Sequence, residues 1–551
     1  MPTTIEEKKT VTREVLLGDE AVARGALHAG ITAAYAYPGT PATEIHECLL
    51  QHAERHGKPR VAWCANEKTA YETALGVSMA GRRVLVDMKH VGLNVAADPF
   101  INSAIVAIHG GLVVAVADDP GMHSSQNEQD SRFYADFART ICLEPADQQE
   151  AYAMTREAFA LSERFQVPVM VRLVTRLAHS RAVLETQAAE KERPASKVAD
   201  PRAWTLLPGN ARRQWDDLLA RQEEMQAWTA GSPYNTLDLN PDFTELGIIT
   251  TGVARNYYLE NVGDMAVRPS HLHIGAYPMP MEMIQTLAAQ VKRIVVLEEG
   301  YPLVERILRG VLPMPLEVQG KESGHVPLSG ELTPEIARRA MGLPVREHLE
   351  SEAVQLPGRP PQLCPGCPHQ DSYGAMAIAL EGMDQAMVAS DIGCYTLGAL
   401  PPYRAIESTV CMGASVGMAR GAGEAGFHPA VGVIGDSTFL HSGVTPLMDA
   451  VSCQADMTLI IMDNGTVGMT GGQPTILPSS RLEKLILGLG VEPEHCHVLH
   501  AHPRKLSEMA AVMRTEFQYH GLSVIICARP CIETARKMKK QKDAKQAKDA
   551  R

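Results

Sequence analysis

The sequence predicts an α/β protein built from several parallel-sheet domains. Near-continuous apolar runs of strand length at 84–90, 111–120 and 167–175 alternate with longer helical patterns at 66–81 and 149–165. Strands that are apolar on both sides are typical of sheets covered by helices on both faces, and alternation with helices indicates parallel pairing. A length of 551 residues is too great for one hydrophobic core, so several such domains are expected.

The same rhythm of strands and helices returns twice further along the chain. Later strands are predicted at 245–252, 271–278, 293–300, 430–438, 457–465 and 522–530. Between the first two α/β segments lies a charged stretch that holds three of the four tryptophans, and a polar linker at 346–361 precedes the last segment. The predicted domains are a first α/β domain at 15–185, a helical connector at 186–243, a smaller α/β domain at 244–345, a third α/β block at 362–532 and a basic tail at 533–551.

Composition excludes several classes of protein. The chain has 52 basic and 64 acidic side chains, a formal charge of −12, which argues against a general nucleic-acid binder. The N-terminus shows no apolar signal region, and no apolar run approaches the roughly 18 residues that span a bilayer. The 11 cysteines are an odd number without a signal peptide, so a reduced, cytoplasmic protein without membrane contact is expected.

Two predicted strands of the third block end in polar turns. One ends in Gly435-Asp436-Ser437, and the next ends in Asn464-Gly465-Thr466. Because adjacent parallel strands place their following loops at one edge of the sheet, Asp436 and Asn464 are expected to lie close together. Two oxygen ligands suit Mg²⁺, which usually keeps substrate phosphates in its shell, and small residues let a diphosphate approach the backbone. Each turn alone is more often a turn than a site.

Together the two turns resemble the thiamine diphosphate (TPP) motif, with Ser437 in place of its last glycine. The resemblance implies that Asp436, Asn464 and the Thr466 carbonyl hold Mg²⁺. TPP chemistry also needs a glutamate facing N1′ of the aminopyrimidine, where the carboxylate controls the proton that sets the tautomer of the ring. The candidate is Glu67, at the start of a predicted helix, where a lone glutamate otherwise compensates the helix dipole.

A second chemical pattern is the CxxC motif formed by Cys364 and Cys367. Two soft ligands on one tight loop indicate a metal or iron–sulfur site, while zinc would need two further ligands. Cys394 and Cys531 are flanked by turn-forming residues, and four thiolates are what a [4Fe–4S] cluster requires. The rival candidates by composition are Cys411 and Cys527. The second of these lies inside an apolar strand and is better explained as core.

Longer runs point to one family. In chain order they are LLGDEAVARGALHAGI, YPGTPATEI, MKHVGLNVAADP, ADDPGMHSSQNEQDSR, CPGCPH, SDIGCYTLGALPP, CMGASVGMARG and IGDSTFLHSGVT. They resemble the alpha subunits of indolepyruvate ferredoxin oxidoreductase, within the TPP-dependent 2-oxoacid:ferredoxin oxidoreductases, over roughly residues 15–532. The resemblance implies a pyrimidine-binding TPP domain first, a transketolase C-terminal-like domain next, and a diphosphate-binding TPP domain with the iron–sulfur site last.

The resemblance also implies roles for individual residues. Glu67 becomes the catalytic partner of the aminopyrimidine, and Thr40 lies near the thiazolium and the substrate. The cluster nearest TPP takes the thiolates of Cys364, Cys367, Cys394 and Cys531. Further cofactor contacts are expected from Gly413, Ala414, Gly435, Asp436, Ser437, Thr438, Asn464 and His369.

The implied reaction is oxidative decarboxylation of an aryl 2-oxoacid, of the indolepyruvate or phenylpyruvate type, with coenzyme A. Electrons pass to one [4Fe–4S] cluster and then to ferredoxin or a partner redox subunit. The implied assembly is a hetero-oligomer of dimerised alpha chains with a smaller beta, gamma-domain-type, subunit. Members of the family usually continue into a ferredoxin-like domain with repeated CxxCxxCxxxCP, and this sequence is expected to be a variant without it.

Alternatives remain at this stage. A non-redox TPP decarboxylase would share Asp436, Asn464 and Glu67, and a non-catalytic scaffold would use the CxxC for structural zinc. Lys89 and His90 end a predicted strand and are either site residues or a polar cap. A polar set that lines either the substrate mouth or a hydrated loop is His123, Gln126, Asn127 and Arg132. The 2-oxoacid side chain and the electron acceptor are not defined by the sequence.

Overall fold

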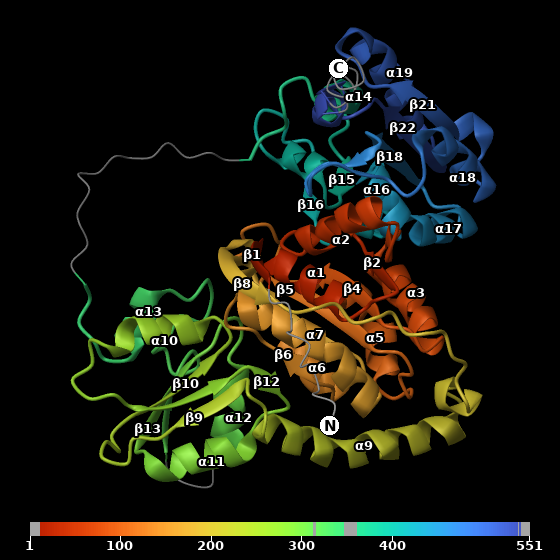
Figure 1. Cartoon of the computed structure of the whole chain (residues 1–551). Coiled ribbons are helices and arrows are strands. Elements are labelled where there is room, and N and C mark those ends of the chain that lie inside the picture. Colours follow the sequence, from red (N-terminus) through yellow and green to blue (C-terminus); the bar gives the residue numbers. More distant parts are fainter. Residues whose placement is uncertain (1–11, 312–315, 347–360, 538, 541–551) are drawn as a thin grey trace, which may run out of the picture. The chain divides into compact units, whose positions relative to one another are not determined.

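A computed structural model describes residues 12–311, 316–346, 361–537 and 539–540. The chain forms two compact units, residues 1–350 and 351–551 (Figure 1). Most of the predicted linker at 346–361 and most of the basic tail at 533–551 lie outside the described residues. None of the described helices is both long and apolar enough to cross a bilayer.

The first unit is built around a seven-stranded sheet. In sheet order its strands are β12 (Ala276–Tyr277), β6 (Cys142–Leu143), β7 (Val169–Val174), β5 (Leu112–Asp118), β4 (Val84–Lys89), β2 (Ala33–Ala36) and β3 (Arg60–Trp63). All neighbours pair in parallel except β12 with β6. The strands predicted at 84–90, 111–120 and 167–175 are confirmed as β4, β5 and β7, and every residue of these three strands is buried.

A five-stranded sheet follows within the same unit. Its order is β14 (Glu317–Gln319), β13 (Arg293–Leu297), β10 (Gly247–Thr251), β11 (Ser270–Ile274) and β9 (Asn235–Asp238). Only β9, from the segment predicted as a helical connector, pairs antiparallel. The apolar run 271–278 does not form one strand: it splits into β11 and β12, which belong to different sheets. This short run therefore ties the two sheets of the unit together.

Helices cover both faces of these sheets. Those of the first unit are α1 (Gly18–His28), α2 (Thr43–His56), α3 (Glu67–Met79), α4 (His90–Val95), α5 (Ala97–Ser103), α6 (Arg132–Ala138), α7 (Gln148–Phe165), α8 (Thr175–His179), α9 (Pro208–Ala230), α10 (Ala254–Val262), α11 (Met281–Gln290), α12 (Leu303–Val311) and α13 (Pro334–Ala340). A small antiparallel sheet pairs β1 (Thr12–Leu17) with β8 (Arg181–Thr186). The predicted helices at 66–81 and 149–165 are confirmed as α3 and α7.

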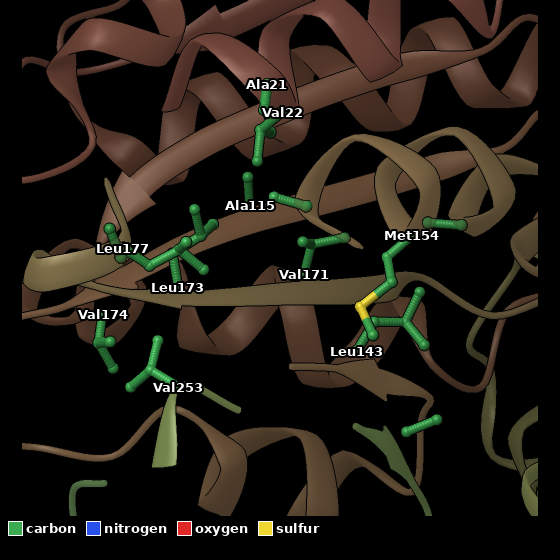
Figure 2. Close-up of a cluster of buried hydrophobic side chains, with 14 of the residues drawn as sticks. Ala21, Val22, Ala115, Leu143, Met154, Val171, Leu173, Val174, Leu177 and Val253 are labelled. Atoms are coloured by element: carbon green, nitrogen blue, oxygen red, sulfur yellow. The ribbon is translucent and has the colours of Figure 1, made fainter. Parts of the chain in front are cut away.

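One apolar cluster joins these layers (Figure 2). It contains Val22 of α1, Ala115 of β5, Val171 of β7 and Met154 of α7, all fully buried. Val253, which follows β10 of the second sheet, packs into the same cluster. Burial of apolar surface on this scale is the main stabilising contribution to such a unit.

A buried ionic network, here called the arginine clamp, also joins the two sheets. Arg172 of β7 is fully buried, and its guanidinium lies 2.7 Å from Asp118 Oδ2 and 2.5 Å from Glu144 Oε1. Arg132 is equally buried and lies 2.5 Å from Asp130 Oδ2 and 3.1 Å from Glu298 Oε2, beyond the end of β13. Burial opposes the charge on Arg132, yet the surrounding carboxylates hold its pKa well above the usual value. Each buried guanidinium of the arginine clamp is therefore paired with buried carboxylates.

The second unit has one six-stranded, all-parallel sheet. Its order is β16 (Ser408–Thr409), β15 (Met387–Ser390), β17 (Ala430–Gly435), β18 (Met457–Asp463), β22 (Leu522–Ala528) and β21 (Cys496–His500). Its helices are α14 (Pro368–Leu380), α15 (Ala414–Glu424), α16 (Asp436–Thr438), α17 (Val444–Ser452), α18 (Leu482–Gly488) and α19 (Leu506–Gln518), and a hairpin pairs β19 (Thr466–Val467) with β20 (Gln473–Pro474). The predicted α/β class with parallel sheets is confirmed in both units.

Candidate functional site

The carboxyl edge of the six-stranded sheet gathers the residues that the sequence predicted to bind Mg²⁺ and the diphosphate. Asp436 directly follows β17, and Asn464 directly follows the adjacent strand β18. The backbone N–H of Gly465 donates to Asp436 Oδ2 at 2.7 Å, so the two turns are in contact. Carboxyl ends of parallel strands are where α/β proteins bind their ligands.

Two buried carboxylates face each other at this edge. Asp436 and Asp463 are 4% and 3% exposed. Burial, followed by the charge of Asp463, raises the pKa of Asp436 well above its usual range. Two carboxylates in one dry site are stable only if a proton or a cation lies between or beside them, so the donor set fits a divalent cation.

Asn464 connects this edge to the helix that follows the CxxC motif. Its side-chain amide lies 3.2 Å from His369 Nε2, and its Oδ1 accepts the N–H of Thr466 at 2.9 Å. His369 is 2% exposed, and burial lowers the pKa of its imidazole to about 4. A neutral imidazole at this position donates one hydrogen bond from one ring nitrogen and accepts one at the other, without adding charge.

The predicted diphosphate residues lie around the same edge. Gly435 leaves no room for a side chain, because a Cβ there would be 2.6 Å from the Tyr395 ring. Gly413 has a φ of +93°, and its N–H donates to Asp391 Oδ1 at 2.6 Å. The N–H of Ala414 donates to the Cys411 carbonyl at 3.1 Å. Ser437 and Thr438 are buried in α16 after β17.

The four predicted cluster cysteines come from three loops at this edge. Cys364 and Cys367 precede α14, Cys394 follows β15, and Cys531 follows β22. Burial raises the pKa of Cys394 to about 12, and thiolates at the other three positions oppose its ionisation further, so it lies within electrostatic reach of all of them. The N–H of Cys531 donates to the Asn464 carbonyl at 3.0 Å, which joins the cysteine loops to the Asp436 edge.

A zinc ion and an iron–sulfur cubane require different spacings between their thiolate ligands. Four thiolates at about 2.3 Å from one zinc ion lie about 3.8 Å from each other. Within the described chain, no three of these cysteines bring their sulfur atoms within 4.8 Å of one another. One zinc ion would need these sulfur atoms closer together, whereas a cubane takes one thiolate at each of four separate irons.

Arg529 holds the CxxC loop against the sheet. This residue follows β22, and its guanidinium donates to the Gly366 carbonyl at 2.8 Å and lies 2.8 Å from Asp371 Oδ2. Gly366 has a φ of +79°, a conformation that favours glycine. Of the rival cysteines, Cys411 is exposed, and Cys527 is buried in β22, as the apolar run around it indicated.

The predicted catalytic glutamate lies in the first unit. Glu67 is the first residue of α3 and only 4% exposed, and the side chain of Asn66 caps that helix by accepting the N–H of Thr69 at 2.8 Å. The backbone of α4 approaches it so closely that a Cβ on Gly92 would lie 2.6 Å from Glu67 Oε1. The position of the carboxylate therefore depends on a glycine in a neighbouring helix.

Thr40 and Lys89 are joined through Ser124. The Ser124 hydroxyl donates to the Thr40 carbonyl at 3.2 Å, and Lys89 Nζ donates to the Ser124 carbonyl at 3.0 Å. Burial lowers the pKa of Lys89 to about 8, while the charges of Asp119 and Glu67 act in the opposite direction. Lys89 is thus electrostatically coupled to Glu67 as well as to Asp119.

We expect Gly92→Ala to reduce 2-oxoacid oxidation at least about 10-fold while the fold is kept, because the new methyl group displaces the Glu67 carboxylate. The measurement is steady-state activity together with far-UV circular dichroism. The matched control is Gly76→Ala in α3, where a Cβ meets nothing within 4 Å. If both variants keep full activity, the close approach at Gly92 has no functional role.

One member of the predicted polar set lies elsewhere. Arg132 does not line a mouth, because it is buried in the arginine clamp. His123 is 53% exposed and lies 3.4 Å from Glu331. The sequence showed only that both residues follow a strand; of the carboxylates around Arg132, Asp130 is a near neighbour in the chain, whereas Glu298 comes from a distant segment.

Sequence reasoning also missed three residues of the edge. Asp391 receives the N–H groups of Gly413 and Ser415 at the start of α15, Asp463 faces Asp436, and Arg529 holds the CxxC loop. Each directly follows or ends a strand of this sheet, and that position was a usable signal for them.

Two models of known protein families match parts of this chain. Residues 24–214 fit the family model described as "Pyruvate flavodoxin/ferredoxin oxidoreductase, thiamine diP-bdg", and residues 391–527 fit "Thiamine pyrophosphate enzyme, C-terminal TPP binding domain". The chain is 39% identical over 546 residues to indolepyruvate oxidoreductase subunit IorA of Archaeoglobus fulgidus, covering 94% of this chain and 86% of that protein. The chain belongs to the IorA family. Its membership makes it an enzyme of the TPP-dependent 2-oxoacid oxidoreductases.

Other members of the family show the same coverage. IorA of Methanothermobacter thermautotrophicus is 36% identical over 94% of this chain and 86% of its own length. A solved structure of 2-oxoglutarate:ferredoxin oxidoreductase from Magnetococcus marinus, with 2-oxoglutarate, coenzyme A and succinyl-CoA bound, has a TM-score of 0.50 at 18% identity, covering 61% of this chain and 66% of that chain. The second likeness concerns the fold alone. The family model for the C-terminal TPP-binding domain covers Asp436 and Asn464, so the predicted requirement for TPP is confirmed.

Proposed function

We propose that this IorA-family chain oxidatively decarboxylates an aryl 2-oxoacid with coenzyme A and passes the electrons to a [4Fe–4S] cluster that it holds itself. The observation that carries the proposal is the contact between the two predicted centres. The N–H of Cys531 donates to the carbonyl of Asn464, so a cluster ligand and a magnesium ligand lie on bonded loops. A one-electron acceptor at that position suits oxidation coupled to decarboxylation.

TPP, when bound, supplies a carbanion and an electron sink for decarboxylation. Asp436 and Asn464 offer the oxygen ligands for Mg²⁺, with the Thr466 carbonyl as a third. His369 is neutral at the pH of the cell and lies beside Asn464, where it can contact a diphosphate oxygen. Glu67, in the first unit, holds or releases the proton at N1′ of the aminopyrimidine.

In this proposal, electrons leave the cluster on the side of its exposed cysteine. Cys364 is exposed, while Cys367 is buried and Cys394 and Cys531 are partly buried. One side of the cluster therefore faces solvent or a partner. We propose that ferredoxin or a partner redox subunit docks there, that a smaller beta subunit completes the assembly, and that the alpha chains dimerise. Co-purification with neighbouring gene products tests the assembly.

The substrate proposal follows the names of the relatives, which are indolepyruvate oxidoreductase subunits. The test is anaerobic reduction of a viologen dye that depends on both the 2-oxoacid and coenzyme A. Indolepyruvate and phenylpyruvate are expected to give a higher kcat/KM than pyruvate or 2-oxoglutarate. Equal or lower values for the aryl substrates would contradict the assignment, and decarboxylation without dye reduction would favour a non-redox TPP decarboxylase.

Cys394→Ala is expected to remove most of the cluster iron and its broad visible absorbance, because the cubane loses one of its four thiolate ligands. TPP binding is expected to persist, since the Asp436 edge is unchanged. The control is Cys453→Ala, which removes an exposed cysteine from the same unit. Unchanged iron in Cys394→Ala would disprove the ligand assignment, and zinc without iron in the native protein would favour a scaffold.

A further inference from the structure

Asp19 is a buried carboxylate that none of the assigned functions uses. It is the second residue of α1 and is 0% exposed. Neither of its oxygens has a hydrogen-bond partner among the described residues. Burial raises the pKa of Asp19 well above its usual range, and the charges of Glu44, Asp87 and Glu20 act in the same direction. A buried carboxylate normally has a hydrogen-bond or metal partner, which makes Asp19 a candidate ligand.

Two potential ligands stand next to this carboxylate. One carboxylate oxygen each from Asp19 and Glu44 and one ring nitrogen of His179 all lie within 4.8 Å of one another. Glu44 Oε2 is 3.5 Å from His179 Nε2, and this interaction lowers the pKa of Glu44 and raises that of His179. The side chains of Glu44 and His179 are 38% and 36% exposed, so the site has a buried base and an open mouth.

The three ligands are held by elements that pack tightly together. Gly18 approaches α8 so closely that a Cβ there would be 2.2 Å from the Leu177 carbonyl, and its N–H donates to the Ser180 carbonyl at 3.3 Å. Val22 of α1 and Leu177 of α8 also share the apolar cluster (Figure 2). The start of α1 and the end of α8 therefore have fixed positions, and the site is formed before a ligand arrives.

We propose that Asp19, Glu44 and His179 form a binding site for a divalent transition cation of the Zn²⁺ type. Two carboxylate oxygens and one imidazole nitrogen are a mixed donor set that zinc accepts with a water in its fourth position. Mg²⁺ and Ca²⁺ prefer oxygen ligands throughout, so the imidazole favours the transition metal. The site shares no residue with the TPP, Mg²⁺ or cluster assignments and stands independently of them.

A second triad in the chain provides a contrast. His428, Asp456 and His520 also place their ligand atoms within 4.8 Å of one another. There the carboxylate already has a partner, because His520 Nδ1 lies 2.8 Å from Asp456 Oδ2, and the carboxylate is 38% exposed. Asp456 is partly exposed and paired through one of its oxygens, whereas Asp19 is fully buried and unpaired at both, so this second triad is the matched control.

The test is equilibrium dialysis of the holoenzyme, with its other cofactors bound, against buffered free Zn²⁺, followed by metal analysis. The wild type is expected to hold one more zinc per chain than Asp19→Asn, and His179→Gln is expected to lose the same equivalent. His520→Gln is expected to keep it. Excess Mg²⁺ is expected not to displace this zinc.

A thermal measurement accompanies the metal analysis. At free Zn²⁺ about 100 times the dissociation constant, the ratio of folded to unfolded wild-type protein rises about 100-fold, and that of Asp19→Asn stays unchanged. If Asp19→Asn and His179→Gln both retain the zinc of the wild type, or if His520→Gln alone loses it, the proposal is overturned. Full displacement by Mg²⁺ would overturn the choice of metal class.

Discussion

Replacing Arg172 by methionine is expected to lower the free energy of unfolding of the first unit by about 3–5 kcal/mol. The guanidinium lies 2.7 Å from Asp118 and 2.5 Å from Glu144, and all three side chains are buried. Methionine fills similar space but leaves these carboxylates without their main countercharge. The cost is large because the buried acids must either stay charged in a dry interior or take up protons.

The measurement is urea unfolding followed by tryptophan fluorescence. All four tryptophans, at positions 63, 204, 215 and 228, lie in the first unit, so the signal reports on that unit alone. The control is Arg13→Met, which removes a surface pair with Glu185 whose side chains are 75% and 53% exposed. Exposed pairs contribute roughly 0–1 kcal/mol. Equal midpoints for the two variants would show that the arginine clamp does not stabilise the unit.

Asp436→Asn is expected to abolish Mg²⁺-dependent retention of TPP and, with it, the activity. Loss of groups that merely support metal ligands costs about 10–100-fold in affinity, so loss of a direct ligand is expected to cost at least about 100-fold. The metal-free variant is expected to be as stable as the wild type or more stable. An amide removes the charge that burial and Asp463 disfavour at this position.

Two readouts test this prediction separately. TPP affinity is measured by calorimetry at fixed Mg²⁺, and thermal stability is measured without either ligand. The control is Asp449→Asn in α17, where the same change falls on a side chain that is 76% exposed. Wild-type TPP affinity in Asp436→Asn would remove Asp436 from the magnesium site, and a collapse of stability without ligands would show a structural role instead.

Most of the second unit could be anticipated because its signals are local. The apolar runs at 430–438 and 457–465 became β17 and β18, and their polar ends, Asp436 and Asn464, meet as the parallel pairing required. Asp391 and Arg529 escaped notice because each resembles an ordinary turn residue. Their importance appears only when β15 and β22 join the same sheet edge.

The run 271–278 shows a different limit. Its apolar pattern indicated one strand, but the chain turns after Ile274 and gives two residues, Ala276–Tyr277, to the larger sheet. Hydrophobic periodicity shows that a segment is buried. It does not show which other segment it packs against. The same limit explains Arg132, whose carboxylate partners include Glu298, far away in the chain.

The α/β class, the dependence on TPP and the family could be inferred from the order of apolar strands, polar strand ends and long motifs. The structure was needed to show that Cys394 lies within electrostatic reach of three other thiols, that carboxylates neutralise Arg172 inside the first unit, and that Asp19 is buried without a hydrogen-bond partner among the described residues. Burial, charge pairing and metal geometry depend on distances between segments far apart in the chain, and packing alone sets those distances.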